Sequence, residues 1–138
     1  MPDADPRIGT TLKDKWHIDA LLGAGGMAEV FLAEHRTLNT LCVVKIQHTR
    51  LARDPSIAGR IRLEAESLSR LNDAHIVSII GSGQTLDERP FIVMEYLRGQ
   101  TMADELAARG QLPPLEALDY ICQLLRGQIG RASCRERV

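Results

Sequence analysis

Apolar residues in the first half of the chain are spaced as they are in short strands. Every second residue from 16 to 22 is apolar, which predicts a strand with one buried face. Segment 29–33 fits either a second strand or the beginning of a helix, because Ala, Glu and Leu also favour helices. After a turn at 36–40, the β-branched run 41–46 predicts a further strand.

Two more apolar runs, 76–80 and 91–94, predict an antiparallel pair of strands. Gly81 and Gly83 stand between these runs, so we expect both glycines in the connection. Residues 1–15 contain Pro, Gly and acidic residues and are expected to form a flexible lead-in, with order beginning near residue 16.

A helix is predicted from Asp54 and Pro55, because Asp is a good N-cap and Pro suits the first helical position. The residues that share one face of this helix are Ile57, Ile61, Glu64, Leu68 and Leu71. A carboxylate in an apolar stripe needs a partner when it is buried. Glu64 therefore either reaches water at the edge of the stripe or forms an ion pair with Lys45, the one lysine in an apolar strand.

Two shorter helical patterns follow. Thr101 and Asp104 form a capping box that predicts a helix ending near Gly110. Pro113 and Pro114 open another helix, whose apolar face comprises Leu115, Leu118, Ile121, Cys122 and Leu125.

Composition narrows the class of protein. The chain has 138 residues, of which 44% are hydrophobic, which suits one ordinary domain or a piece of a larger one. A formal charge of -1 argues against a nucleic-acid partner, and no apolar run is long enough for a membrane segment. The three widely spaced cysteines suit reduced thiols, so we expect a cytoplasmic protein.

The segment from Leu22 to Val30 is rich in glycine and follows directly on a predicted strand. Glycine lets the backbone come close to a ligand and aim successive N–H groups at a phosphate. The glycines indicate a phosphate site more strongly when a lone lysine follows in one of the next strands, as Lys45 does here. An ordinary structural turn is the alternative interpretation of the glycines alone.

The order of these features resembles the N-terminal lobe of a protein kinase. The order is that of bacterial (eukaryotic-like) serine/threonine kinases: a glycine loop, a strand with Lys45, a helix with Glu64, and the run from Ile92 to Leu97. The resemblance implies an α+β fold over residues 16–128. It comprises a five-stranded antiparallel sheet with one long helix, the hinge, and the first, incomplete helices of the C-terminal lobe.

The resemblance also implies an ATP site. The family's G-x-G-x-x-G-x-V motif falls on Gly23, Gly25, Ala28 and Val30, with Ala28 in place of the third glycine. Lys45 corresponds to the lysine on the α- and β-phosphates, and Glu64 to its partner. The remaining expected cofactor-binding residues are Leu22, Ala24, Gly26, Met27, Val43, the gatekeeper Met94, and Glu95 and Leu97 through their backbone. Thr101 falls near the ribose position.

Several family motifs do not occur in the 138 residues. The chain contains no H-R-D, D-F-G or A-P-E motif, so it has neither the catalytic Asp nor the Mg²⁺ ligands of the family. We expect ATP and Mg²⁺ as cofactors and a protein Ser/Thr hydroxyl as substrate of the kinase, but no activity from this chain alone. Residues 129–138 match one translated frame of a common sequencing adaptor, and we expect them not to belong to the domain.

Two alternatives belong to other classes of function. One is a non-catalytic nucleotide-binding module. The other is a Rossmann-type dinucleotide-binding domain, since Gly23, Gly25 and Ala28 also fit G-x-G-x-x-G/A. That fold needs a helix directly after the loop and an acidic residue about 20 positions later. Val43, Val44 and Lys45 occupy that region instead.

Overall fold

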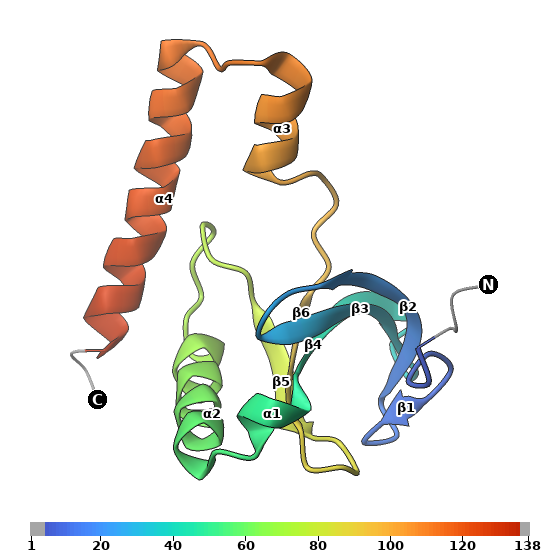
Figure 1. Cartoon of the computed structure of the whole chain (residues 1–138). Helices are drawn as coiled ribbons and strands as arrows, with labels where there is room; N and C mark the ends of the chain where they lie inside the picture. The colour runs from blue at the N-terminus through green and yellow to red at the C-terminus, as the bar shows by residue number, and fades with distance from the viewer. Residues whose placement is uncertain (1–4, 136–138) are drawn as a thin grey trace. The chain divides into compact units, whose positions relative to one another are not determined.

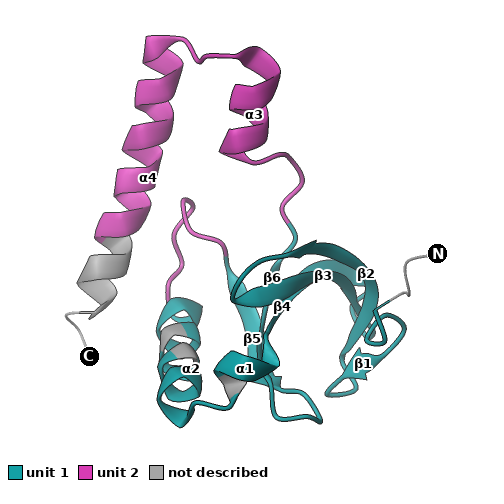
Figure 2. Ribbon diagram, viewed as in Figure 1, with its two compact units in different colours: residues 1–70, 78–96 teal, residues 71–77, 97–138 magenta. Residues whose placement is uncertain are grey.

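The chain divides into two compact units. The computed structural model describes the backbone of residues 5–135, and the side chains of that range except Ala52, Ile61, Glu64 and residues 130–135. The first unit comprises residues 1–70 and 78–96, and the second comprises residues 71–77 and 97–138 (Figure 2).

An antiparallel sheet of six strands forms most of the first unit (Figure 1). Its strands, in chain order, are β1 (Thr11–Leu12), β2 (Trp16–Ala24), β3 (Ala28–His35), β4 (Thr40–Gln47), β5 (Ile79–Gln84) and β6 (Pro90–Glu95). Across the sheet their order is β1-β2-β3-β4-β6-β5, so β1 and β5 are the two edges.

The sheet curls until its two edges approach each other. Lys13 follows β1, and its Nζ donates to the carbonyl oxygen of Ser82 on β5 at 3.1 Å. Inside the curl, the Trp16 and Phe91 rings meet edge to face with centroids 6.0 Å apart. The buried core on this inner face comprises Trp16, Ile18, Phe31, Ala33, Cys42, Val44, Ile46, Phe91 and Val93. Burial raises the pKa of the Cys42 thiol, which is free.

The sixth strand is a correction to the five that the sequence predicts. Strand β1 comes from the segment expected to be a flexible lead-in, and it pairs with β2 through Thr11 opposite His17. Ahead of β1, the Gly9 N–H donates to the Ile18 oxygen at 2.8 Å. Order in the described part of the lead-in therefore begins before residue 16, because these bonds occupy the outer edge of β2. Residues 1–4 lie outside the described residues.

Strand β5 is also displaced from its prediction. It begins at Ile79 and runs through Gly81 and Gly83, which the sequence placed in the connection. A Cβ at Gly81 would lie 2.8 Å from the Trp16 ring, and one at Gly83 would clash with the Lys13 side chain and lie 2.9 Å from the Phe91 ring. These glycines make room for the aromatic core rather than for a turn. The connection itself occupies residues 85–89, where the Thr85 N–H donates to the Arg89 oxygen.

Segment 29–33 belongs to β3, which settles its ambiguity in favour of a strand. Strands β2 and β3 form an antiparallel hairpin around the glycines. A dinucleotide-binding domain needs a helix there and a parallel sheet, so that alternative is wrong. The alternation expected from 16 to 22 also ends early, because register shifts interrupt β2 between Ile18 and Ala20 and between Leu21 and Gly23.

The predicted helix after Asp54 is confirmed as α2 (Pro55–Ser69), which packs on β5 and β6. The Asp54 side chain caps it by accepting the Ser56 N–H at 2.9 Å. Ala65 is buried on this helix, whereas Leu71 lies beyond its end, so the stripe is shorter than expected. The side chains of Ile61 and Glu64 lie outside the described ones. A short helix, α1 (Thr49–Ala52), was not predicted.

The second unit contains the two predicted helices, α3 (Met102–Arg109) and α4 (Pro114–Arg135). The capping box is confirmed, since Thr101 accepts the Asp104 N–H while the Asp104 side chain accepts that of Thr101. Arg109 joins the helices by a forked ion pair to Glu116, at 2.6 and 2.9 Å.

None of the helices in the part of the chain that the structure describes has the length and hydropathy that crossing a membrane requires. The backbone of α4 continues to Arg135, while residues 136–138 and the side chains of 130–135 lie outside the description. The adaptor origin of residues 129–138 therefore stays a prediction.

Candidate functional site

Pairing between strands brings several of the predicted site residues into one row. Gly23 pairs with Val30, Val30 with Lys45, and Lys45 with Ile92. Two residues further along these strands, Val43 pairs with Met94. Partners directly across a ladder lie on the same face of a sheet, as do residues two apart on one strand. Val30, Val43, Lys45 and Met94 therefore share the face opposite to the buried core.

The predicted glycine loop closes the hairpin of β2 and β3 at one end of this row. The Gly25 N–H donates to the Ala28 oxygen at 2.9 Å. A Cβ on Gly23 or Gly26 would meet nothing within 4 Å, and the Met27 side chain is 63% exposed. Side-chain packing therefore does not hold this loop in place.

Hydrogen bonds from the end of β4 hold the loop instead. The His48 N–H donates to the Met27 oxygen at 3.0 Å, and His48 Nε2 lies 2.6 Å from the Gly25 oxygen. The Arg50 guanidinium donates to the Gly26 oxygen at 3.3 Å. Sequence reasoning missed both side chains. No local sequence pattern indicates these bonds, because each joins residues that are 23 or 24 positions apart in the chain.

An ion pair between Lys45 and Glu64 was one of the two expectations for Glu64. Lys45 is exposed on the face opposite to the buried core, next to Val43 and in line with Ile92. Helix α2, which carries residue 64, packs on the neighbouring strands β5 and β6. The Glu64 side chain lies outside the described residues, so its pairing with Lys45 stays a prediction.

The predicted hinge residues lie in different units. Glu95 ends β6, where its N–H donates to the Ser78 oxygen and its carboxylate accepts the Ser78 N–H at 2.8 Å. Leu97 and Thr101 belong to the second unit. The Thr101 hydroxyl is engaged in the cap of α3, with Oγ1 donating to Asp104 at 2.6 Å. This gives Thr101 a structural role of its own.

A cluster of charges lies on β3 just beyond the loop. The Glu29 carboxylate is paired with Arg7 at 2.5 Å and with Arg89 at 3.2 Å. Arg89 is buried, and its Nε also donates to the Gln47 oxygen at 2.6 Å. The two guanidinium groups hold the pKa of Glu29 below its usual range, while partial burial acts in the opposite direction. This cluster fastens the N-terminal segment to β3 at the base of the loop.

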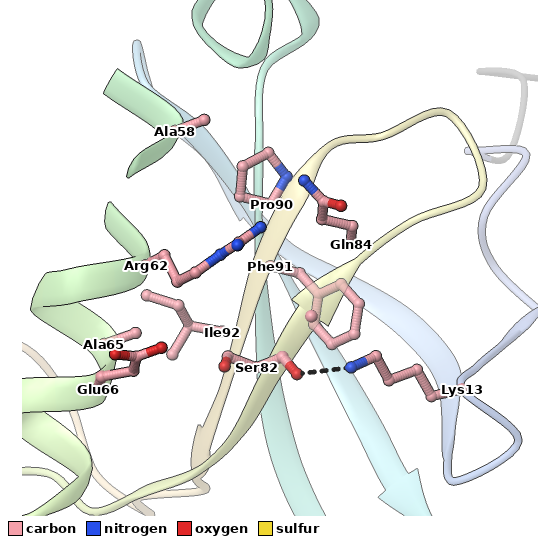
Figure 3. A pocket seen from close by; sticks show the side chains of 11 residues that line it. Lys13, Ala58, Arg62, Ala65, Glu66, Ser82, Gln84, Pro90, Phe91 and Ile92 are labelled. Atoms are coloured by element: carbon pink, nitrogen blue, oxygen red, sulfur yellow. Dashed lines mark hydrogen bonds between the residues drawn. The ribbon is translucent and has the colours of Figure 1, made fainter. Parts of the chain in front are cut away.

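A cavity of about 340 Å³ lies between α2 and strands β5 and β6 (Figure 3). Ala58, Arg62 and Ala65 of the helix face Ile92 and Ser82 of the strands. None of the residues predicted to bind the nucleotide lines it. It is therefore a gap beside the helix and not the predicted site. The described side chains include no group of three or more His, Cys, Asp or Glu that could hold a metal ion.

Comparison with known proteins identifies relatives of this arrangement. The profile of the protein kinase domain matches residues 16–128. The chain is 38% identical over 120 residues to the serine/threonine-protein kinase PknB of Mycobacterium tuberculosis and 38% identical over 118 residues to PrkC of Bacillus subtilis. It is 34% identical over 124 residues to pkn3 of Myxococcus xanthus. These matches cover 83–90% of the chain but only 18–23% of each relative, about a fifth of its length.

Solved structures agree with the sequence relatives. The crystal structure of the Mycobacterium tuberculosis PknI kinase domain superposes with a TM-score of 0.74 at 25% identity. The match covers 85% of this chain and 47% of that one. A variant of the same domain gives a TM-score of 0.80 and covers 90% of this chain.

Proposed function

This chain belongs to the protein kinase domain family, and on that premise we propose that its curled sheet is the ATP-binding part of a serine/threonine kinase. The kinase would transfer the γ-phosphoryl group of ATP to Ser or Thr hydroxyls of a protein. The observation that carries the proposal is the row formed by Gly23, Val30 and Lys45. It lines up the glycine loop, an apolar side chain and a cation on one face.

Each part of this face suits a different part of ATP. Leu22 and Val30 would cover one side of the adenine, with Val43 beside them and Met94 at its edge. Glu95 and Leu97 would offer backbone groups to the rim of the base. Lys45 would hold the α- and β-phosphates, with Glu64 fixing the ammonium group. The loop N–H groups would complete the phosphate site, since phosphoryl transfer depends on positioning and charge stabilisation.

The 138-residue polypeptide lacks the residues for the transfer step itself. It contains neither the H-R-D aspartate nor the D-F-G aspartate, the groups with which the family orients the acceptor hydroxyl and holds Mg²⁺. We therefore propose that this polypeptide binds ATP without transferring phosphate. Incubated with labelled Mg·ATP and a generic protein acceptor, it is expected to label nothing above background, and reproducible labelling would contradict this part of the proposal.

Binding is tested most directly at Lys45. Lys45→Met is expected to weaken ATP binding by calorimetry at least tenfold while leaving the melting temperature unchanged, since the side chain is exposed and a charge-assisted bond to phosphate is lost. Arg36→Met, which removes an exposed cation from the turn between β3 and β4, is the matched control and should bind ATP normally. Equal affinity of the Lys45 and Arg36 variants would refute the site.

The pairing of Lys45 and Glu64 is tested by a double-mutant cycle. Glu64→Gln should weaken ATP binding less than Lys45→Met does, because it frees the ammonium group without removing it. The double variant should bind little worse than Lys45→Met alone, as expected for residues that act as one unit. Losses that simply add would contradict the pairing.

A location in the cytoplasm completes the proposal. ATP is available there, and the free thiols of Cys42 and Cys122 suit a reducing compartment.

A further inference from the structure

Three successive carbonyl groups of the glycine loop point at one short stretch of chain. The oxygens of Gly25, Gly26 and Met27 accept hydrogen bonds from the His48 side chain, the Arg50 side chain and the His48 N–H respectively. We call these three bonds the loop tether. The donors lie just past the end of β4, the strand that carries Lys45.

Peptide planarity fixes what the tether does to the opposite side of the loop. In a trans peptide the carbonyl of one residue and the N–H of the next point in opposite directions. When the Gly25 and Gly26 carbonyls face His48 and Arg50, the N–H groups of Gly26 and Met27 face away from them. Among the described residues, no acceptor takes either N–H. Two neighbouring donors are thus held pointing outward, where an anion can accept from both.

Besides the tether, the bond from the Gly25 N–H to the Ala28 oxygen closes the base of the loop, but side-chain packing does not fix the orientation of these donors. The positions of Gly23 and Gly26 are open, since a Cβ there would touch nothing within 4 Å. Glycine also costs the most conformational freedom to order, so an untethered loop of this sequence would sample many orientations. Because the tether already orders the loop, a ligand that binds there loses less free energy to ordering the loop.

In the bond between His48 and Gly25, the histidine ring is the donor. A carbonyl oxygen can only accept, so Nε2 must carry the hydrogen, as it does both in one neutral tautomer and in the cation. Arg50 is always charged and always a donor. At 2.6 Å the bond from His48 to Gly25 is much shorter than the 3.3 Å bond from Arg50.

We propose that His48, assisted by Arg50, is a positioning residue that orients the glycine loop for the phosphate groups of ATP. The inference rests on the proposed function and deepens it. In this role His48 would act through the backbone of Gly25 and Met27, whose oxygens accept its two hydrogen bonds, and not on the nucleotide itself. Because its own N–H holds Met27 whatever the side chain, a substitution removes one bond of the three and leaves the loop partly tethered.

Binding of ATP and of adenosine by the full chain separates positioning from general damage. His48→Ala is expected to weaken ATP binding about three- to tenfold, the worth of one hydrogen bond, while adenosine binding stays unchanged. His48→Gln retains an N–H donor and should recover part of the ATP affinity. Arg50→Ala should have a smaller effect in the same direction. Arg53→Ala removes a nearby arginine that makes no described side-chain bond, and should bind both ligands normally.

Two results would overturn the inference. One is His48→Ala with unchanged ATP affinity, and the other is an equal loss for ATP and adenosine, which would indicate damage beyond the loop.

A measurement without nucleotide distinguishes failure of the tether from failure of the proposed function. Backbone ¹⁵N relaxation should give Gly26 and Met27 high order parameters in the free wild-type chain and lower ones in His48→Ala. If the wild type binds no ATP, the proposed function and the phosphate role of the loop are both wrong. The relaxation data would still show whether the His48 side chain orders the loop. Equal order parameters in the two proteins would refute this ordering.

Discussion

The curled sheet and the helices α3 and α4 differ in how they bury apolar side chains. The sheet encloses a continuous core whose largest members, among them Phe31, Phe91 and Ile18, are almost fully buried. Helix α3 has no buried residue, and in α4 Leu115 is 82% and Leu124 64% exposed. The sheet is therefore stabilised by contacts between distant parts of the chain. The helices depend on caps, ion pairs and local contacts within their own unit.

This difference matters for function because most residues of the proposed ATP site, though not Leu97, belong to the sheet with the buried core. The row of Gly23, Val30 and Lys45 is built on strands whose other face is the core. Side chains that must be placed precisely are best carried by such rigid elements.

In the second unit, α4 packs closely at Gly127, where a Cβ would lie 3.1 Å from the His75 oxygen.

The largest expected effect separates the two regions by their cores. Phe31→Ala should destabilise the sheet by about 3–5 kcal/mol, because it removes a fully buried ring and leaves a cavity. Leu124→Ala, in an exposed position of α4, should change stability by no more than about 0.5 kcal/mol. Denaturant unfolding followed by Trp16, the single tryptophan, measures the first unit. Similar losses in the two variants would contradict the comparison.

Charge should also matter more in the sheet than in the helices. Glu29→Gln breaks the pairs with Arg7 and Arg89 and should cost about 1.5–3 kcal/mol, the range for bonds to charged groups in a partly buried setting. Glu116→Gln breaks the exposed pair with Arg109 and should leave the Trp16 unfolding curve unchanged. A larger effect at Glu116 than at Glu29 would reverse this ranking.

The same glutamate predicts how the sheet responds to acid. The pKa of Glu29 is lowered in the folded state by Arg7 and Arg89, and that of Asp5 chiefly by its bond to Arg7. A lowered folded pKa means that protons bind the unfolded chain more tightly. The stabilisation is therefore complete above the unfolded values near pH 4 and is lost as the pH falls through the folded ones. Glu29→Gln should lose less stability than wild type between about pH 5 and pH 2, measured by unfolding at each pH.

Two glycines provide a smaller and more specific test. Gly81→Ala should destabilise the sheet by about 1–3 kcal/mol, because the new methyl group would press on the Trp16 ring. Gly59→Ala, in α2, meets open space and should stabilise by up to about 1 kcal/mol through helix propensity. In thermal unfolding, Gly81→Ala should lower the melting temperature and Gly59→Ala should raise it. Two variants that shift stability in the same direction would show that close packing at Gly81 is not decisive.

The smallest expected effect belongs to the second unit. Thr101→Ala removes the cap of α3 and should cost about 1 kcal/mol of helix stability, seen as lower helix content by circular dichroism. Thr101→Ser keeps a capping hydroxyl and should restore most of it. The emission of Trp16 should follow the same unfolding curve in all three proteins. A shift of that curve in Thr101→Ala would mean that the cap acts beyond its own helix.

The local features of this protein could be read from its sequence. Asp54 and Thr101 cap the helices they were expected to cap, because a cap is decided by residues two or three positions apart. The kinase family followed from the order of the glycine loop, Lys45 and the run ending at Leu97, and it is confirmed. The β-branched run 41–46 predicted the strand that carries Lys45, since β-branched residues favour strands locally, whereas the pairing of Lys45 with Val30 came only from the register of the folded sheet.

Only the tertiary structure decided the features that depend on partners far away in the sequence. Gly81 and Gly83 have the appearance of turn residues until the Trp16 and Phe91 rings occupy the space beside them. Strand β1 forms because β2 offers it a free edge, not because Thr11 and Leu12 favour a strand. His48 acquires its role only when the curl of β3 and β4 brings the loop carbonyls within hydrogen-bond distance of its ring. The physical reason is the same in each case. Propensity and periodicity act between neighbours, whereas packing and hydrogen bonding across the sheet depend on residues that only folding brings together.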